Sequence, residues 1–128
     1  GFRAFQRFEE ETGFKPLAGW VERELIHPTW DFCGHPDAFG YLNDGGPSVA
    51  LFDWKTNSFD ERAAGRQLAA YAMLWEANGS DEKLGRAFVV LLNTDTGNYR
   101  LIPIDWRPHL QVFQAALVVY NELRRNGA

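Results

Sequence analysis

Two short apolar runs on either side of a well-marked helix constrain the fold of this chain more than any other feature. Residues 49–52 read Val-Ala-Leu-Phe and residues 88–92 read Phe-Val-Val-Leu-Leu, which is typical of strands in the interior of a sheet. Between them, Ser58-Phe59-Asp60-Glu61 matches a capping box, residues 61–76 are mostly good helix formers, and Asn78-Gly79 is a stop signal. The centre of the chain therefore predicts a strand, a helix and a second strand.

The flanking segments add further helices and strands to this centre. Phe2, Phe5 and Phe8 recur at helical spacing, so we predict a first helix over residues 2–11 that stops near Gly13. Strands are predicted over residues 20–26, 37–42, 48–55, 84–92 and 99–104, and a last helix over residues 108–125. The order helix, three strands, helix, two strands, helix predicts an α/β fold, with a mixed central sheet flanked by helices. We find no repeat or long linker, so residues 1–128 are interpreted as one domain.

Composition excludes several classes of protein. The chain has 128 residues and one cysteine, Cys33, so it cannot form an intramolecular disulfide or a site made of several cysteines. We interpret Cys33 as a small buried residue and the setting as reducing and cytoplasmic. No apolar run approaches the roughly 20 residues that span a bilayer, so we expect no membrane association. The net charge of −4 disfavours a nucleic-acid partner, unless bound divalent cations neutralise some of the acids.

Acidic residues on the predicted strands suggest metal chemistry. Alternation along residues 48–55 places Asp53 and Lys55 on one face of the strand and Trp54 on the other. Glu22 and Asp37 precede them on or beside earlier strands. Hard divalent cations prefer carboxylate oxygens, and such a cation can orient a water molecule and offset charge on a phosphate. Taken alone, Asp53 and Lys55 are more readily explained as an ordinary charge pair at the end of a strand.

Several motifs in order resemble the RecB-like branch of the PD-(D/E)XK nuclease superfamily, including compact phage-type exonuclease domains. That branch carries an upstream glutamate, a G-x-x-D, a D-x-K and a downstream Q-x-x-x-Y on a helix. The matching segments are Glu22, Gly34-His35-Pro36-Asp37, Asp53-Trp54-Lys55-Thr56 and Gln67-Leu68-Ala69-Ala70-Tyr71. The resemblance covers about residues 20 to 75. It implies a restriction-endonuclease-like core, and the predicted αβββαβ order agrees with that core.

The resemblance also implies a metal site for Mg²⁺ or Mn²⁺. By this analogy, Asp37 and Asp53 are metal ligands, and the backbone carbonyl of Trp54 is a further ligand. Glu22 is an additional ligand or contacts the metal through water. Glu24 is predicted on the same strand face as Glu22 and is a rival for its role.

The remaining residues of the motifs are expected to assist catalysis. The resemblance implies that Lys55 positions water or stabilises charge. Gln67 and Tyr71 are four residues apart, hence on one helix face, and by analogy they support the site and approach the substrate strand. Because the chain has only Cys33, it departs from the iron–sulfur members of the branch, and we expect no iron–sulfur cluster.

Other polar residues are candidates for contact with nucleic acid. Arg62 and Arg66 lie one turn apart on the predicted central helix, where contact with phosphate is plausible. His35 and Thr56 lie inside the motifs and are further candidates, although for His35 an ordinary surface position is favoured. Four tryptophans are interpreted as core residues rather than stacking platforms, namely Trp30, Trp54, Trp75 and Trp106. His27 is interpreted as a surface or capping residue, and His109 likewise.

These expectations combine into a functional hypothesis with two alternatives. The leading one is a metal-dependent deoxyribonuclease, more plausibly an exonuclease of recombination or repair than a sequence-specific endonuclease, because no base-reading module is recognisable. Its small size and acidic charge suggest a ring-like homo-oligomer or a module of a larger assembly. The first alternative is a catalytically inactive nuclease fold that binds nucleic acid or a partner protein. The second, a small-molecule enzyme, is disfavoured because Gly45-Gly46 lies in a turn and not at a helix start.

Overall fold

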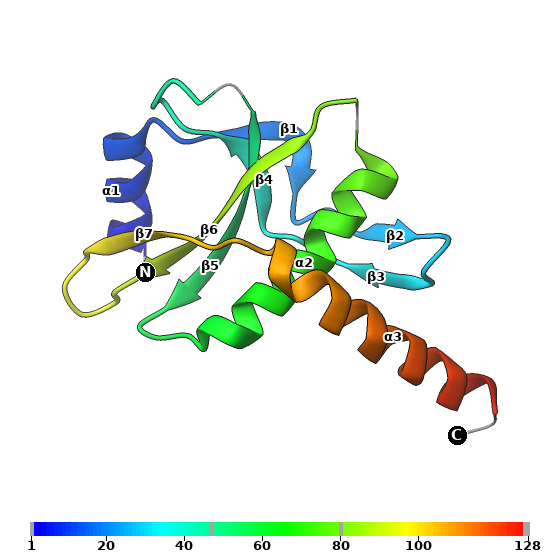
Figure 1. The fold of residues 1–128 in the computed structure, drawn as a ribbon. Helices are drawn as coiled ribbons and strands as arrows, with labels where there is room; N and C mark the ends of the chain where they lie inside the picture. The colour runs from blue at the N-terminus through cyan, green and yellow to red at the C-terminus, as the bar shows by residue number, and fades with distance from the viewer. Residues whose placement is uncertain (1, 47, 80, 127–128) are drawn as a thin grey trace.

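The computed structural model describes residues 2–46, 48–79 and 81–126. Three α-helices and seven strands occur in this part of the chain (Figure 1). In order, they are α1 (Phe2–Thr12), β1 (Lys15–Val21), β2 (Leu25–His27), β3 (Phe32–Gly34), β4 (Ala38–Tyr41), β5 (Val49–Thr56), α2 (Glu61–Asn78), β6 (Leu84–Leu92), β7 (Tyr99–Pro103) and α3 (Leu110–Arg125), with a 3₁₀ turn η1 (Arg107–His109) before α3.

Five of the strands form one mixed sheet in the order β1-β4-β5-β6-β7. Strands β5 and β6 pair in parallel, and the other neighbouring strands pair antiparallel. Helix α2 makes the crossover that a parallel pair requires. The two apolar runs therefore occupy interior strands, as predicted, and the expected mixed sheet with flanking helices is confirmed.

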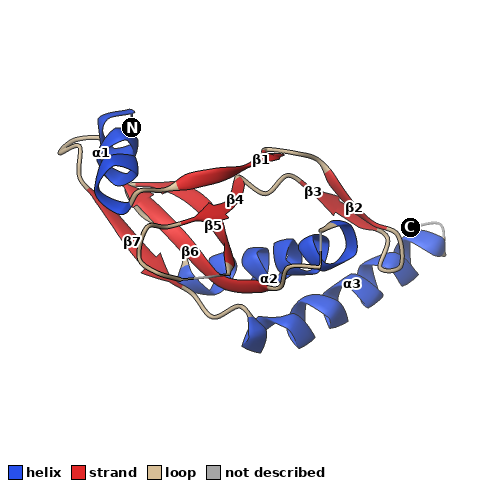
Figure 2. Cartoon of the chain, turned by 90° about the horizontal axis from the view of Figure 1, so that it is seen from above, coloured by secondary structure: helices blue, strands red, loops and turns tan. Residues whose placement is uncertain are grey.

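The helices divide between the two faces of the sheet (Figure 2). Helix α1 covers one face, while α2 lies on the other, with α3 packed beside α2. Alternation along β5 follows this division: Val49 and Leu51 belong to the core under α2, and Ala50 and Phe52 to the core under α1. The side to which each β5 residue points is thus set by its position in the strand.

The core under α1 is largely aromatic. Phe8 of α1 is fully buried, and Phe14 and Phe52 meet edge to face with their ring centroids 4.7 Å apart. Phe5 packs against Trp54 in the same way, with 5.3 Å between centroids. Trp54 is therefore a partly buried packing residue on the α1 face of the sheet, in line with its interpretation as a core residue.

The core under α2 is centred on Trp75, which is 2% exposed. Its ring lies 4.7 Å from that of Phe39 and 4.7 Å from that of Trp20. The indole nitrogen of Trp75 donates a hydrogen bond to the backbone carbonyl of Glu82 over 2.9 Å. This packing attaches the C-terminal half of α2 to the sheet.

The prediction of one strand over residues 20–26 was wrong. Strand β1 ends at Val21, and Glu22 has a positive φ of 51°, a left-handed conformation that interrupts a strand. The chain then forms a separate hairpin of β2 and β3, so five strands precede α2 and not three. Cys33 lies in this hairpin and is exposed, which also contradicts its interpretation as a buried residue.

The ends of the helices differ slightly from the prediction. The N-cap of α2 is Asp60, whose carboxylate accepts a hydrogen bond from the Arg62 amide, and not Ser58. Helix α2 ends at Asn78, which is followed by Gly79, in agreement with the predicted stop. The last helix begins as η1 around Pro108, and α3 follows from Leu110. Within the described ranges, no helix is both long and apolar enough to cross a membrane.

Candidate functional site

Asp37 and Asp53 come together on neighbouring strands of the sheet. Ala38 of β4 lies opposite Phe52 of β5, so Asp37, one residue before β4, is brought opposite Asp53. Both residues are shielded from solvent, and Asp53 is only 3% exposed. Two carboxyl groups that are far apart in sequence thus share one partly buried position beneath α2.

Burial, together with the adjacent Asp53 carboxyl, raises the proton affinity of Asp37. Burial raises the pKa of Asp37 to about 6, and the hydrogen bonding and charge of the adjacent Asp53 carboxyl act in the same direction. The backbone amide of Trp54, which donates to Oδ2 of Asp37 over 2.8 Å, and the charge of Lys55 oppose this rise. Two carboxylates this close are favourable only when a proton or a cation separates their charges.

One oxygen of Asp53 lacks a hydrogen-bond donor. Oδ2 of Asp53 is buried and accepts no hydrogen bond from any described residue. The ammonium nitrogen of Lys55 lies 3.1 Å from it, within ion-pair distance but without the directional geometry of a hydrogen bond. A buried carboxylate oxygen of this kind is costly unless another group satisfies it.

A chain of polar contacts connects this pair to α2. Nζ of Lys55 donates to Oε1 of Gln67 over 2.9 Å. Nε2 of Gln67 in turn donates to the hydroxyl of Tyr71 over 3.1 Å. Burial raises the pKa of Tyr71, and the charge of Asp53 adds to this effect. Asp37, Asp53, Lys55, Gln67 and Tyr71, all selected from the sequence, therefore form one connected group.

Glu22 stands apart from this group. Its backbone amide donates to the carbonyl of Asp37 over 3.0 Å, which places the two main chains side by side. Its side chain is exposed, however, as is that of Glu24. Among the described residues, no set of three or more His, Cys, Asp or Glu side chains could hold a metal ion. The structure thus brings together two of the three predicted acidic ligands.

The predicted nucleic-acid contacts all lie on the surface. His35 and Thr56 are exposed, close in sequence to Asp37 and Lys55 respectively. Arg62 and Arg66 are exposed on α2, and their guanidinium groups form no ion pair with the residues that the structure describes. These basic groups are therefore available to an external anion.

Sequence reasoning missed Asn57, which shapes the turn after Lys55. Asn57 has a positive φ of 65°, and its backbone amide donates a hydrogen bond to the backbone carbonyl of Leu92 over 2.9 Å. Its Oδ1 accepts hydrogen bonds from the amide and hydroxyl of Thr94. The available signal was an asparagine directly after a strand, because Asn tolerates the left-handed conformation better than most residues.

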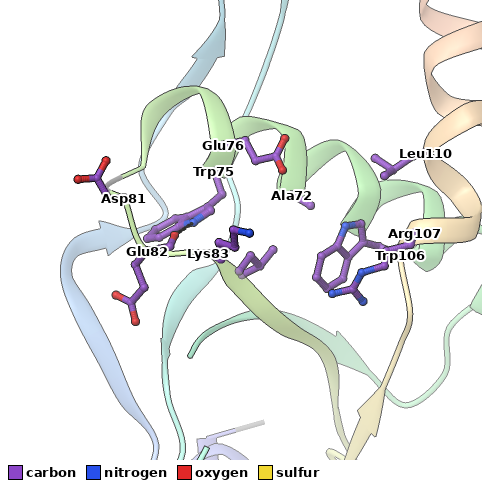
Figure 3. A pocket seen from close by; sticks show the side chains of 10 residues that line it. Ala72, Trp75, Glu76, Asp81, Glu82, Lys83, Trp106, Arg107 and Leu110 are labelled. Carbon is purple, nitrogen blue, oxygen red and sulfur yellow. Dashed lines mark hydrogen bonds between the residues drawn. The ribbon is translucent and has the colours of Figure 1, made fainter. Parts of the chain in front are cut away.

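Two hollows of similar size lie near α2. One, of about 380 Å³, has Lys55 and Gln67 in its wall and so adjoins the carboxylate pair. The other, of about 400 Å³, lies between the second half of α2, the segment before β6 and the start of η1 (Figure 3). Trp75 and Trp106 face this second hollow. It contains none of the residues of the carboxylate pair and its polar chain.

The chain was compared with models of known protein families and with curated proteins. No family model matches it, and no curated protein does. Its functional interpretation therefore depends on its own residues and their geometry.

Proposed function

We propose that this chain is a divalent-metal-dependent nuclease that hydrolyses phosphodiester bonds of DNA. The observation that carries the proposal is the pair Asp37 and Asp53, whose carboxyl groups share one partly buried position with the ammonium group of Lys55 beside them. A fold gains little stability from such a pair, because burial and the adjacent Asp53 carboxyl both oppose the ionisation of Asp37. A role in chemistry explains the arrangement better.

The residues present fit a divalent cation. Mg²⁺ is commonly bound through only one or two carboxylates, with water and substrate phosphates completing its coordination. Asp37 and Asp53 provide two carboxylates, and the buried Oδ2 of Asp53 has no hydrogen-bond donor. Mg²⁺ or Mn²⁺ would satisfy that oxygen and offset the repulsion within the pair. The carbonyl of Trp54 is a further candidate ligand from the same strand.

Lys55 is suited to act on the substrate. When bound, a divalent cation polarises the phosphate and makes water a better nucleophile. The Lys55 ammonium, held by Gln67 over 2.9 Å, is positioned to orient the attacking water and to stabilise charge on the phosphate. Tyr71 acts through Gln67, because its hydroxyl accepts the hydrogen bond from the Gln67 amide.

DNA is proposed as the substrate on the basis of the motif resemblance and of the exposed groups near the site. Arg62 and Arg66 on α2 form no ion pair within the described structure and are suited to contact phosphates, with His35 and Thr56 as further candidates. An exonuclease of recombination or repair, resembling phage-type enzymes, is the favoured form. The net charge of −4 is consistent with a requirement for bound metal. It is also consistent with activity as part of a homo-oligomer or a larger assembly.

The decisive experiment compares wild type and Lys55→Ala on end-labelled linear and circular DNA with Mg²⁺ or Mn²⁺. We expect wild type to degrade linear DNA only, and Lys55→Ala to lose about 100-fold or more in rate. Lys15→Ala is the matched control, because Lys15 is an exposed lysine on β1 that has no part in the site. Cleavage of circular DNA would indicate an endonuclease instead.

The alternative, an inactive nuclease fold that binds nucleic acid or a protein, predicts a different outcome of the same assay. DNA would be bound but left intact with either metal. Wild type and Lys55→Ala would then both lack nuclease activity. Cleavage that needs no divalent metal, or equal rates for wild type and Lys55→Ala, would contradict the proposed role of this group of residues.

A further inference from the structure

The hollow beside Lys55 lies in the angle between the end of β5 and the first turns of α2. Its volume is about 380 Å³. Lys55 and Gln67, which belong to the polar chain of the site, form part of its wall. Any group that occupies this hollow is therefore next to the position proposed for the scissile phosphate.

The lining of the hollow combines apolar and polar side chains. Phe59 contributes a half-buried aromatic side chain, and Ala63 and Ala64 add two small apolar ones. Ser58 and Asp60 add a hydroxyl and a carboxylate, one oxygen of which accepts the hydrogen bond from the Arg62 amide. An aromatic wall with a few polar groups suits a flat, uncharged ligand with hydrogen-bonding edges.

The carboxylate of Asp60 disfavours a phosphate as the occupant of the hollow. A phosphate would meet this like charge, while the ammonium group of Lys55, the cation in the lining, is already engaged by Asp53 and Gln67. A nucleobase carries no charge, and it can stack on an aromatic ring while its edge bonds to hydroxyl, amide or carboxylate groups. The charge and the side-chain composition of the lining thus favour a base over the sugar–phosphate backbone.

We propose that this hollow binds the unstacked base of the nucleotide adjacent to the scissile phosphate. The inference rests on the proposed function and specifies its substrate. In a duplex the base is paired and stacked, and removing it costs free energy, whereas a base in a single strand or at a frayed end is free to enter. The substrate class is therefore single-stranded DNA or a frayed DNA end, with little preference among bases because every base offers a face for stacking.

The test fills the hollow without touching the catalytic group. Ala63 is exposed on α2 and lines the hollow, so Ala63→Leu obstructs it with a good helix former. Ala77→Leu is the matched control, since Ala77 is also exposed on α2 and lines neither hollow. Binding is measured by fluorescence anisotropy with labelled oligothymidine that contains phosphorothioate linkages, in Mg²⁺. A deoxyribose–phosphate strand without bases is measured in parallel.

Ala63→Leu is expected to bind oligothymidine about 10-fold more weakly than wild type, while Ala77→Leu binds like wild type. The strand without bases is expected to bind equally weakly to all three proteins. Equal binding of oligothymidine by the two variants, or tight binding of the baseless strand by wild type, would overturn the inference and leave the nuclease proposal intact. Base-dependent binding by a protein that leaves unmodified linear DNA intact in Mg²⁺ or Mn²⁺ would instead support the hollow and refute the nuclease. Failure of wild type to bind oligothymidine would refute the inference.

Discussion

The backbone amide of Trp54 donates a hydrogen bond to Oδ2 of Asp37 over 2.8 Å, from one strand of the sheet to the residue that precedes its neighbour. This bond orients the Asp37 carboxyl toward β5, where Asp53 projects on the α2 side. It also supports the ionised form of Asp37, although burial prevails and raises the pKa to about 6.

The raised pKa of Asp37 predicts how stability depends on pH in metal-free protein. Between about 4, the pKa of an unfolded aspartate, and about 6, the folded state holds more protons than the unfolded state. The free energy of unfolding should therefore fall as pH rises through this range. Asp37→Asn keeps an oxygen for the Trp54 amide and should remove the decrease, as measured by urea unfolding at several pH values after chelation.

Asp105 provides a control, because its pKa is shifted in the direction opposite to that of Asp37. The backbone amide of Arg107, and then its guanidinium group, lower the pKa of Asp105. Asp105 therefore contributes stability above the unfolded pKa, and that contribution is lost as pH falls. Asp105→Asn should leave the decrease between pH 4 and 6 in place. If Asp37→Asn shows the same pH profile as wild type, Asp37 is not the group that titrates.

Divalent metal should stabilise the folded protein. A ligand that binds only the folded state adds about 2.7 kcal/mol at a concentration 100 times its dissociation constant, which corresponds to a rise of several degrees in Tm for a domain of this size. Addition of Mg²⁺ or Mn²⁺ should raise the Tm of wild type in a calorimetric scan. Asp53→Asn should abolish the rise, whereas Asp81→Asn, which alters the hollow of Figure 3, should retain it. An equal rise in both variants would place the metal elsewhere.

The contacts of Lys55 predict a graded loss of activity along the polar chain. Gln67→Ala removes the acceptor that holds the ammonium group and should lower kcat about 10-fold with little change in KM. Tyr71→Phe removes only the hydroxyl behind Gln67 and should cost about threefold. Steady-state kinetics at saturating Mg²⁺ measures both variants. A larger effect of Tyr71→Phe than of Gln67→Ala would indicate that the hydroxyl acts directly on the substrate.

Gly40 should be essential to the edge of the sheet. A β-carbon at this position of β4 would lie 2.3 Å from the backbone oxygen of Lys15 in β1, and neither main chain can yield without disturbing the pairing. Gly40→Ala should lower the free energy of unfolding by about 1–3 kcal/mol in urea titrations. At Gly46 the nearest atom is the flexible end of Arg86, so Gly46→Ala should cost less. Equal losses would show that β1 can shift away from β4.

Local patterns predicted much of this chain because they depend on neighbouring residues. Alternation along β5 places Asp53 and Lys55 on one face and Trp54 on the other. Helical spacing places Gln67 and Tyr71 on one face of α2. The apolar runs identified β5 and β6 as interior strands. Each of these inferences follows from the geometry of a single element.

The tertiary structure alone decided how these elements meet. The interruption at Glu22 depends on a left-handed residue, which hydrophobic alternation does not reveal, and it produced the unpredicted hairpin that exposes Cys33. The contact of Asp37 with Asp53 depends on the register between β4 and β5, and the bond from Lys55 to Gln67 depends on how α2 packs on the sheet. Periodicity describes each segment separately, whereas register and packing are set by contacts between residues far apart in the chain.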